Sequence, residues 1–526
     1  KKTQAEKDPD LGFDMRALSP RGPGVQVLLS NRIQASKAGR YNRMIISGLG
    51  KPQTTYSEPT CPWLKTIHSA LLVHRRGFPL VARQAQITSI KRPHEFYETL
   101  IAAIGRAEKR ISLAALYLGT EEHERRLTLA LGNALRTKPD LTVNLLFDGR
   151  RAWRESKASG LSTVTLLTPL LEAYPGRIKL CLYTLPAAQR AASILKSPLD
   201  EIAGVFHMKA FVLDDELILS GANLSTEYFV DRQDRYVHFG RAETISNFYH
   251  ELIQTLAQTR EATSVGGSST DDGANGRPLR LEDVDNLGDI EAPCLDSPSS
   301  QPPDTWVFPT INCAPLGITQ DFSVTRLLLD SVPRHGEVRL ATAYLNPPEA
   351  LTKSLASSAP DGNVSVLTAH PVSHGFRSAR GLMSLVPKCY AHIEARELGP
   401  AFDARDARKE GRPIQPIQML SYHRPSWTYH AKGLWLREKA GKDPSGPLVT
   451  VMGSSNFGRR SYELDLEAQL VLLSEDPSLG RALETEWNNL SRHCPEAEPP
   501  SAEAKNGGFV KRFAVPFVAA LMGKFL

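Results

Sequence analysis

Several features that would fix an architecture or a chemistry are missing from this chain of 526 residues. Its six cysteines show no CxxC pair and no metal-ligand spacing, which predicts reduced cysteines of an intracellular compartment rather than a disulfide framework. No run of about 18 apolar residues is free of charge, so a spanning helix is not expected. No acidic cluster is suited to Mg²⁺, and we expect neither a metal nor another cofactor.

After the first part of the chain, the numbers of basic and acidic residues nearly balance. Residues 1–83 hold 14 Lys/Arg against 5 Asp/Glu, whereas the remainder holds 49 against 52. A nearly balanced body argues against a nucleic-acid partner. The acid-poor, Arg- and Ser-rich stretch 15–57 is typical of a mitochondrial presequence, and a disordered basic tail is the alternative. Because the chain begins at Lys1, we expect part of such a signal to be missing.

What the chain does contain is an internal repeat. A short apolar run ends in Tyr-Leu at residues 110–118 and again at 339–345, as buried strands would. Each run follows a segment with helical spacing and precedes two further strand-like segments. The repeat predicts an α/β protein made of two similar sandwiches with pseudo-twofold symmetry. The predicted organisation is a basic extension 1–83, a first domain 84–260, a Gly-, Ser- and Pro-rich linker 261–303, a second domain 304–495, and a tail 496–526.

The repeat also carries polar residues in a fixed order. Each copy has an HxK strand, then a turn of small residues ending in Asn, then an acidic residue 11 positions after that Asn. His and Lys two apart on a strand share a face, so both pairs are expected to enter one cavity. An HxK pair alone is weak evidence, but the ordered triplet recurring in a repeat is not expected by chance. The residues are His207, Lys209, Asn223 and Asp234 in the first copy and His430, Lys432, Asn456 and Glu467 in the second.

These residue types suit displacement at a phosphodiester or pyrophosphate. Lysines and asparagines would donate to the non-bridging oxygens, where negative charge grows. One imidazole can attack phosphorus, while the other protonates the leaving oxygen and later takes a proton from the acceptor hydroxyl. The two acidic residues would hold ring N–H groups and fix the tautomers. We also expect the turn residues Ser220 and Ser454 to contact the substrate.

On these motifs the chain resembles the phospholipase D superfamily, whose signature is a duplicated HxKxxxxD with a small-residue-Asn turn. Within it, the chain is similar to the eukaryotic phosphatidylglycerophosphate synthases over most of its length. The segments that carry this likeness include Ser220-Gly221-Ala222-Asn223, 231–236 and 427–436. The resemblance implies transfer of a phosphatidyl group from CDP-diacylglycerol to glycerol 3-phosphate, with release of CMP, in the mitochondrial pathway to cardiolipin. It also implies an enzyme that acts at the mitochondrial inner membrane and needs no metal cofactor.

One departure from the superfamily pattern concerns the aspartate of the motif. It is Asp214 in the first copy, but its counterpart in the second is Arg437. We expect Asp214 to belong to the catalytic set and the two histidines to have unequal roles. By analogy with relatives that use the N-terminal histidine, His207 is predicted to be the nucleophile and His430 the general acid/base; the exchanged assignment stays open.

Two accessory sets of residues lie outside the repeated motif. Arg150, Arg151 and Arg154 follow a strand at the end where α/β sheets usually bind ligands, and could bind the phosphate of glycerol 3-phosphate or the CDP moiety; solvated surface charge is the alternative. Tyr117 and Tyr344 end equivalent strands and are predicted to pack in the core.

The C-terminal segment 509–526 combines apolar residues with Lys511, Arg512 and Lys524. It predicts an amphipathic segment lying on an anionic membrane surface, with a helix docked on its own domain as the alternative. The sequence leaves the oligomeric state open.

Other functions remain possible on the same residues. A phospholipase or nuclease would use water as the acceptor, and a cardiolipin synthase would use phosphatidylglycerol. A catalytically inactive lipid-binding scaffold is suggested by Arg437 but disfavoured by the intact His, Lys and Asn sets.

Overall fold

A computed structural model gives the architecture. It describes residues 58–74, 78–80, 86–192, 204–266, 277–280, 282–283, 287, 303–380, 384–398, 417–441, 443–494 and 515.

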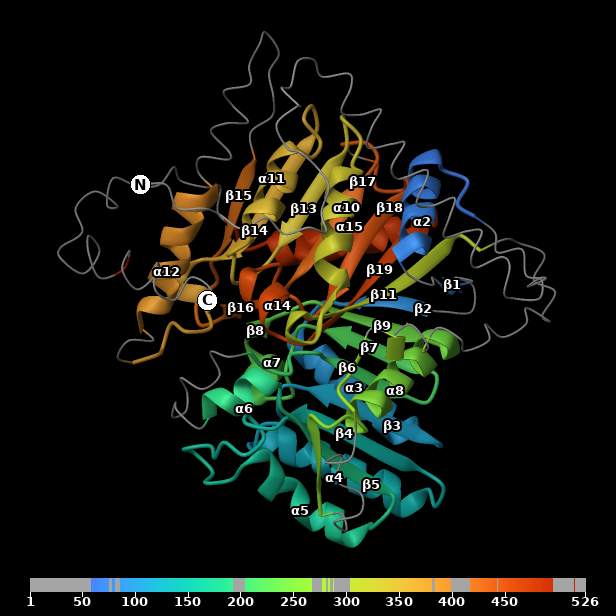
Figure 1. Ribbon diagram of the computed structural model, residues 1–526, viewed down its shortest axis with the longest axis vertical. Helices are drawn as coiled ribbons and strands as arrows, with labels where there is room; N and C mark the ends of the chain where they lie inside the picture. The colour runs from blue at the N-terminus through green and yellow to red at the C-terminus, as the bar shows by residue number, and fades with distance from the viewer. Residues whose placement is uncertain are drawn as a thin grey trace, which may run out of the picture. The chain divides into compact units, whose positions relative to one another are not determined.

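The first half builds an eight-stranded sheet with the strand order β10-β5-β4-β3-β6-β7-β9-β2 (Figure 1). The neighbours β3, β4 and β5 are parallel, and the other pairs are antiparallel. The strands are β2 (Gln86–Ile90), β3 (Arg110–Ala115), β4 (Thr142–Asp148), β5 (Ile178–Tyr183), β6 (Ala210–Leu213), β7 (Glu216–Ser220), β9 (Tyr236–Gly240) and β10 (Ala262–Val265). The helices are α3 (Pro93–Arg106), α4 (Glu122–Thr137), α5 (Thr163–Ala173), α6 (Pro186–Ala192), α7 (Thr226–Val230) and α8 (Glu243–Ala257).

The second half builds a nine-stranded sheet with the order β1-β11-β19-β18-β17-β13-β14-β15, with β12 paired to β11. The strands are β1 (Phe78–Leu80), β11 (Thr305–Cys313), β12 (Ile318–Thr319), β13 (Glu337–Ala341), β14 (Asn363–Ala369), β15 (Gln418–Tyr422), β17 (Gly433–Arg437), β18 (Leu448–Gly453) and β19 (Glu467–Ser474). The helices are α2 (Pro62–His74), α10 (Gln320–Asp330), α11 (Glu349–Ser357), α12 (Val386–Ile393), α14 (Arg459–Glu463) and α15 (Pro477–Ser491), with short turns η4 (Ala314–Leu316), η5 (Pro371–Ser373) and η7 (Glu394–Leu398).

The two sheets repeat one topology. The path β5-β4-β3-β6-β7-β9-β2 of the first sheet matches β15-β14-β13-β17-β18-β19-β11 of the second, with parallel and antiparallel neighbours in the same places. A helix also follows the last repeated strand of each half, α8 after β9 and α15 after β19. The predicted fold class, a duplicated α/β sandwich, is therefore confirmed.

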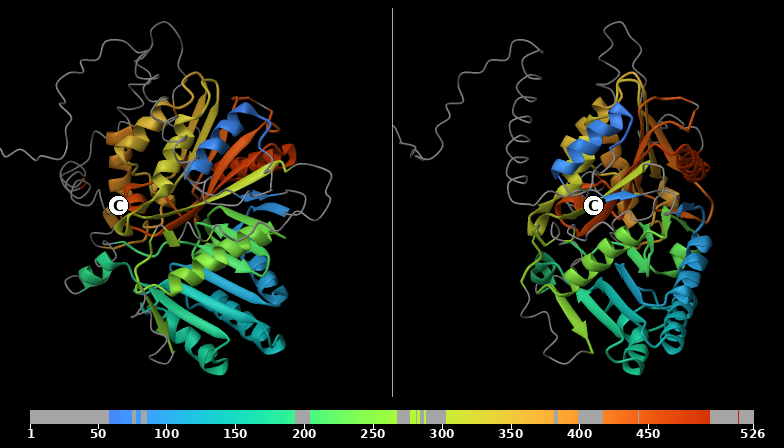
Figure 2. Two further views of the ribbon diagram at one scale, coloured as in Figure 1. Left: turned by 45° about the vertical axis from the view of Figure 1, so that its right-hand side comes forward. Right: turned by 90° about the vertical axis from the view of Figure 1, so that its right-hand side faces the viewer.

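Helices cover the faces of both sheets (Figures 1 and 2), and three large hydrophobic cores lie between these layers. One core lies between the first sheet and helices α3, α4 and α5, and another lies between the second sheet and helices α2, α10 and α11. The largest core joins both sheets through α8 and α15. Strands β3 and β17 are buried along nearly their whole length, as expected for strands covered on both faces.

The boundary of the N-terminal extension differs from the sequence-based expectation. Helix α2 packs on α10, and β1 pairs with β11 in the second sheet, so residues 62–74 and 78–80 belong to the second half although we predicted an extension of 1–83. Strand β10, predicted to fall in the linker 261–303, pairs with β5 in the first sheet. The sequence pattern did not reveal β1 and β10 because edge strands of three or four residues are too short to show a clear alternation.

Arg235 of the first half is buried within the second half. Its guanidinium donates to Glu486 Oε1 at 3.1 Å, to the carbonyl of Val451 at 2.7 Å and to Thr450 Oγ1 at 2.9 Å. It also stacks on the ring of Trp435, whose indole N–H donates to Glu486 Oε2 at 2.9 Å. Removing one partner of such a buried ion pair typically costs about 3–5 kcal/mol because the other charge is left uncompensated, so loss of either Arg235 or Glu486 would weaken the docking of the halves.

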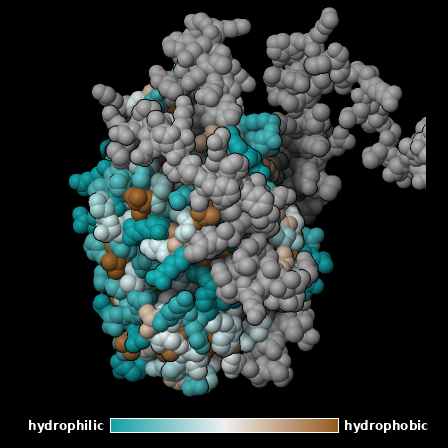
Figure 3. Space-filling model, turned by 90° about the vertical axis from the view of Figure 1, so that its left-hand side faces the viewer, coloured by the Kyte–Doolittle hydropathy of each residue, from teal (hydrophilic) through white to brown (hydrophobic). Residues whose placement is uncertain are grey.

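No helix among the described residues is long and apolar enough to cross a membrane. The predicted interfacial segment 509–526 lies outside the described residues apart from Val515, which packs against Cys389 and Ile393 of α12. On the face shown in Figure 3, described residues are mainly hydrophilic, with apolar side chains scattered singly.

Candidate active site

The two histidine segments are held by backbone pairing between the halves. His430 donates its amide to the carbonyl of Gln233 at 2.7 Å, within a short ladder formed by β16 (Thr428–Tyr429) and β8 (Arg232–Gln233). His207 donates its amide to the carbonyl of Leu466 at 2.9 Å. Each histidine therefore pairs with the residue that directly precedes the acidic residue of the opposite half: His430 pairs with Gln233, before Asp234, and His207 pairs with Leu466, before Glu467.

This pairing brings each imidazole to a carboxylate of the other half. His207 Nδ1 lies 2.9 Å from both carboxylate oxygens of Glu467, and Ser461 Oγ donates to the same carboxylate at 2.7 Å. His430 Nδ1 lies 2.7 Å from Asp234 Oδ2, and Asp234 Oδ1 accepts the amide of Arg235 at 2.8 Å. Both predicted acidic residues therefore contact a ring, and both contacts cross between the halves, which sequence order did not reveal.

The two lysines complete the same buried cluster. Lys209 Nζ donates to the carbonyl of His207 at 2.7 Å, and Lys432 Nζ donates to that of His430 at 2.6 Å. Lys432 Nζ also lies 2.7 Å from His430 Nδ1. That nitrogen cannot both accept from the ammonium and donate to Asp234, and we assign the hydrogen bond to the carboxylate because the lysine is satisfied by the carbonyl. Gly221 admits this lysine, since a Cβ there would collide with Lys432 Cδ.

Burial governs the protonation of this cluster. Desolvation, with Lys209 or Lys432 beside the ring, holds the pKa of His207 and of His430 well below the usual value. Burial also lowers the pKa of Lys209 to about 7 and of Lys432 to about 8.

Burial has the opposite effect on the pKa values of the two carboxylates that hold the imidazoles. Burial raises the pKa of Asp234 and of Glu467 to about 6. Near neutral pH the imidazoles are thus neutral, each with its Nδ1–H donated to a carboxylate and its Nε2 lone pair available.

Asn223 and Asn456 lie near the cluster with incomplete hydrogen bonding. The Asn223 amide meets the hydroxyl of Tyr228 at 3.2 Å, and the Oδ1 atoms of both asparagines are buried without a partner among the described residues. Rotation of either amide about its terminal bond would present an N–H₂ group at the same place. Donation from these side chains to a phosphate oxygen stays a prediction.

The predicted turn serines have a different environment. Ser220 Oγ donates to the carbonyl of Arg235 at 2.8 Å, and Ser454 Oγ lies 3.3 Å from the carbonyl of Ala468 and accepts its amide at 3.1 Å. Their hydroxyls fasten the turns to neighbouring strands, so the structure does not support them as substrate contacts.

Asp214 is likewise separated from the histidines. It follows His207 by seven residues of extended chain, about 20 Å. Its carboxylate accepts the backbone amides of Glu108, Lys109 and Arg110 at 2.7–2.9 Å. Its counterpart Arg437 donates to the carbonyls of Pro444 and Gly480. The expectation that Asp214 is catalytic is therefore not supported. Asp214 and Arg437 each bind backbone groups near the end of a strand, so the difference between them does not affect the histidines directly.

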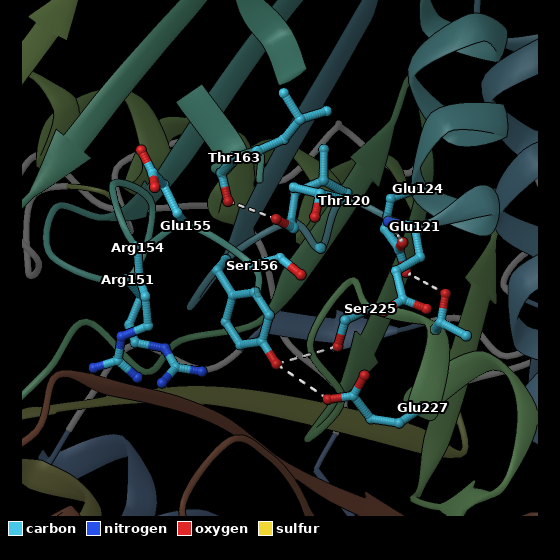
Figure 4. Close-up of a pocket in the computed structure, with 15 residues that line it drawn as sticks. Thr120, Glu121, Glu124, Arg151, Arg154, Glu155, Ser156, Thr163, Ser225 and Glu227 are labelled. Atoms are coloured by element: carbon cyan, nitrogen blue, oxygen red, sulfur yellow. Dashed lines mark hydrogen bonds between the residues drawn. The ribbon is translucent and has the colours of Figure 1, made fainter. Parts of the chain in front are cut away.

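Arg151 and Arg154 line a cavity of about 170 Å³ at the C-terminal ends of β3 and β4, together with Tyr117, Ser225 and Glu227 (Figure 4). Arg151 stacks over the ring of Tyr117 at 4.5 Å, and the Tyr117 hydroxyl meets Ser225 Oγ and Glu227 Oε1, each at 3.2 Å. Arg150 is not among the lining residues; its amide donates to Asp148 Oδ1 at 3.0 Å. Tyr117 thus lines a cavity instead of packing wholly in the core.

Aromatic and basic residues around His430 were missed by sequence reasoning. The rings of Tyr228 and Tyr344 meet the His430 ring at centroid distances of 5.2 and 5.5 Å, and the Tyr228 hydroxyl lies 3.5 Å from His430 Nε2. Arg232 stacks on Tyr228 at 4.6 Å. Tyr344 was predicted to pack in the core. In the sequence, the position of Tyr344 at the end of a strand and that of Arg232 two residues before Asp234 are the features that could have indicated a place near the site.

Three groups of the site have the donor types and spacing of a metal site, since ligand atoms of His207, Asp465 and Glu467 lie within 4.8 Å of one another. These donors have protein partners, however. Asp465 accepts the amide of Val205 at 2.9 Å and the guanidinium of Arg460 at 3.0 Å. A cation would have to displace that guanidinium, so the donor set suits a neutral imidazole hydrogen-bonded to a carboxylate better than a metal.

Two similar α/β halves that each give one HxK histidine to a shared buried centre define a phosphodiester-transfer protein of the phospholipase D type. No protein-family model matches the chain. A probable CDP-diacylglycerol–glycerol-3-phosphate 3-phosphatidyltransferase of Dictyostelium discoideum is 32% identical over 455 residues, covering 82% of this chain and 76% of that protein. A mitochondrial protein of the same name from Cricetulus griseus is 30% identical over 522 residues, covering 90% and 91%.

The chain therefore belongs to the CDP-diacylglycerol–glycerol-3-phosphate 3-phosphatidyltransferase family. A solved structure of a phosphatidylserine synthase from Haemophilus influenzae shares the fold, with a TM-score of 0.65 and 19% identity over 88% of this chain and 99% of that one.

The crossed hydrogen bonds predict a specific effect of amide substitution. In Glu467→Gln or Asp234→Asn the new amide can donate to Nδ1, which forces the ring proton onto Nε2 and removes the lone pair needed there. We expect kcat to fall about 10³-fold or more in each variant, measured as CMP release by folded protein.

The matched control is Asp214→Asn, which removes a carboxylate outside the cluster. It should lower the denaturation midpoint while kcat stays within about threefold of the wild type, because only backbone amides lose an acceptor. An equal loss of kcat in Asp214→Asn and Glu467→Gln would contradict this interpretation.

Proposed function

We propose that this chain transfers the phosphatidyl group of CDP-diacylglycerol to glycerol 3-phosphate, giving phosphatidylglycerophosphate and CMP through a phosphohistidine intermediate. The observation that carries the proposal is the pair of buried imidazoles, each hydrogen-bonded through Nδ1 to a carboxylate of the opposite half and flanked by a buried lysine. The names of the family relatives supply the donor and the acceptor.

His207 is proposed as the nucleophile. Its Nδ1 is occupied by Glu467, and its Nε2 has no hydrogen-bond partner among the described residues. His430 Nε2 instead lies 3.5 Å from the Tyr228 hydroxyl, which suits a group that exchanges protons. This difference supports unequal roles on a basis independent of Asp214.

The reaction then proceeds in two balanced steps. In the first, His207 Nε2 attacks the phosphorus that carries the diacylglycerol, the bond to the CMP oxygen breaks, and CMP leaves with the bonding electrons. In the second, the hydroxyl of glycerol 3-phosphate attacks the same phosphorus, His430 takes its proton, and the bond to His207 breaks. Lys209, Lys432, Asn223 and Asn456 stabilise the negative oxygens in both steps. No metal is assigned a step.

The pocket beside Tyr117 is linked to the surroundings of His430 through its lining residue Glu227, which lies 3.7 Å from Arg232. Its two arginines and several carboxylates and hydroxyls suit a polar part of the donor, such as the cytidine monophosphate group. In that case Arg154→Gln should raise KM for CDP-diacylglycerol.

For localisation we propose peripheral attachment to the mitochondrial inner membrane. Support comes from the mitochondrial relatives and from the Lys- and Arg-containing apolar segment 509–526. Deletion of that segment should reduce flotation with liposomes that contain anionic lipid and should leave neutral liposomes unaffected. Undiminished flotation of the truncated protein would remove this segment from the proposal.

Single-turnover trapping tests the two histidine roles. Protein is mixed with CDP-diacylglycerol labelled in the phosphatidyl phosphate, in EDTA and without acceptor, and quenched in alkali, where phosphohistidine survives. His207→Ala should form no adduct, whereas His430→Ala should accumulate it, because attack by an alcohol needs the base more than departure of CMP does. Accumulation in His207→Ala and none in His430→Ala would exchange the roles.

The protonation states predict a bell-shaped dependence of kcat/KM on pH. The acidic limb should lie near pH 6, where Asp234 and Glu467 gain protons and no longer hold the imidazoles. The basic limb should lie between about pH 7 and 8, because lysines with lowered pKa values lose their charge as the pH rises.

In kcat the basic limb should shift to higher pH, since a bound diphosphate favours the charged ammonium groups. A kcat/KM profile that stays flat from pH 5 to 9 would contradict these assignments.

A further inference from the structure

A second group of donors lies beyond His430, on the far side of Tyr344. The Tyr344 ring contacts the His430 ring at 5.5 Å and the His374 ring at 4.9 Å, so a single aromatic ring separates the two histidines. His374 follows the short turn η5 and is only 2% exposed. The catalytic steps described above make no use of it.

The hydrogen bonding of His374 fixes which of its nitrogens carries a proton. Its Nδ1 accepts the backbone amide of Phe376 at 3.2 Å, so the proton of the neutral ring sits on Nε2. That Nε2 is buried and has no hydrogen-bond partner among the described residues. Burial, with the nearby Arg232, lowers the pKa of His374 to about 4, which keeps the ring neutral. A buried N–H without an acceptor is rare in native proteins and calls for a ligand.

Arg232 brings a guanidinium to the same place. Its Nε donates to Thr428 Oγ1 at 3.0 Å, and its Nη1 lies 3.7 Å from the partly exposed Glu227. Its Nη2 has no hydrogen bond among the described residues, and a Cβ added to Gly375 would lie 4.0 Å from it. The guanidinium edge therefore lies near the backbone just after His374, together with the Tyr344 hydroxyl, which would be 2.5 Å from the same Cβ. Glu227 offsets only part of the guanidinium charge.

We infer that Arg232 and His374 bind the phosphate of the acceptor, a dianionic phosphate monoester, and so select glycerol 3-phosphate over an uncharged alcohol. The inference deepens the proposed function and rests on it. A guanidinium edge and a buried imidazole N–H match the acceptor oxygens of a phosphate.

The position also matches the shape of the acceptor. Its attacking hydroxyl must reach His430, and a three-carbon chain separates that hydroxyl from the phosphate, which places the phosphate to one side of the histidine. In the proposed reaction the donor phosphates are already served by Lys209 and Lys432.

The first test is His374→Phe, which keeps the ring packing and removes the Nε2–H. Steady-state rates are measured with glycerol 3-phosphate and with glycerol. We expect KM for glycerol 3-phosphate to rise about tenfold or more, and the preference for it over glycerol in kcat/KM to fall by the same factor. KM for CDP-diacylglycerol should change by less than about twofold. Arg232→Lys keeps the positive charge but loses the paired N–H donors of the guanidinium, so it should also raise KM for glycerol 3-phosphate. It is the second test variant if His374→Phe does not fold.

The control is His370→Phe, four residues earlier. That ring also accepts the amide two residues on, from Val372 at 3.3 Å, but it stacks on His423 away from the site. It should leave both acceptors' kinetics unchanged. An unchanged acceptor preference in both His374→Phe and Arg232→Lys would overturn the inference. A raised KM for CDP-diacylglycerol with an unchanged KM for glycerol 3-phosphate would also overturn it, by assigning these donors to the donor phosphates. Failure of the proposed function itself would appear earlier, as absence of transfer by the wild type.

Discussion

Two hydrogen bonds, from His207 to Glu467 and from His430 to Asp234, hold the centre of this molecule together because each crosses from one half to the other. Neither half alone can orient its own imidazole. The backbone pairs that precede them and the buried Arg235–Glu486 contact fix the distance between the halves at the point where the rings must face a common phosphorus. Duplication of the fold thus produces a site that exists only when both copies are docked.

Burial makes the same arrangement chemically useful. Two carboxylates and two lysines share a volume from which water is largely removed, and desolvation pushes their pKa values towards one another, to about 6 for the acids and about 7 and 8 for the bases. An anionic diphosphate entering this volume favours the charged lysines, so the substrate itself completes the electrostatics of the site. The neutral imidazoles keep a free lone pair without a metal ligand or a separate base.

The sequence predicted the repeat, the strands and the principal polar groups because these follow local periodicity and fixed spacing. It did not reveal that the carboxylates are exchanged between halves, since sequence order carries no information on docking. Asp214 was misassigned because a motif position was equated with a site position, although seven extended residues carry it away from His207. Tyr344, Arg232 and His374 could not be grouped in advance, because they meet only after strands of both halves pack. The short edge strands β1 and β10 were missed for lack of a detectable pattern.

The stereochemistry at phosphorus tests the central claim most directly, that one histidine carries the phosphatidyl group between two displacements at a shared centre. CDP-diacylglycerol made chiral at the transferred phosphorus is converted with glycerol 3-phosphate, and the configuration of the product is determined. Two in-line displacements through His207 predict overall retention of configuration. Inversion would mean direct attack by the acceptor and would contradict the account.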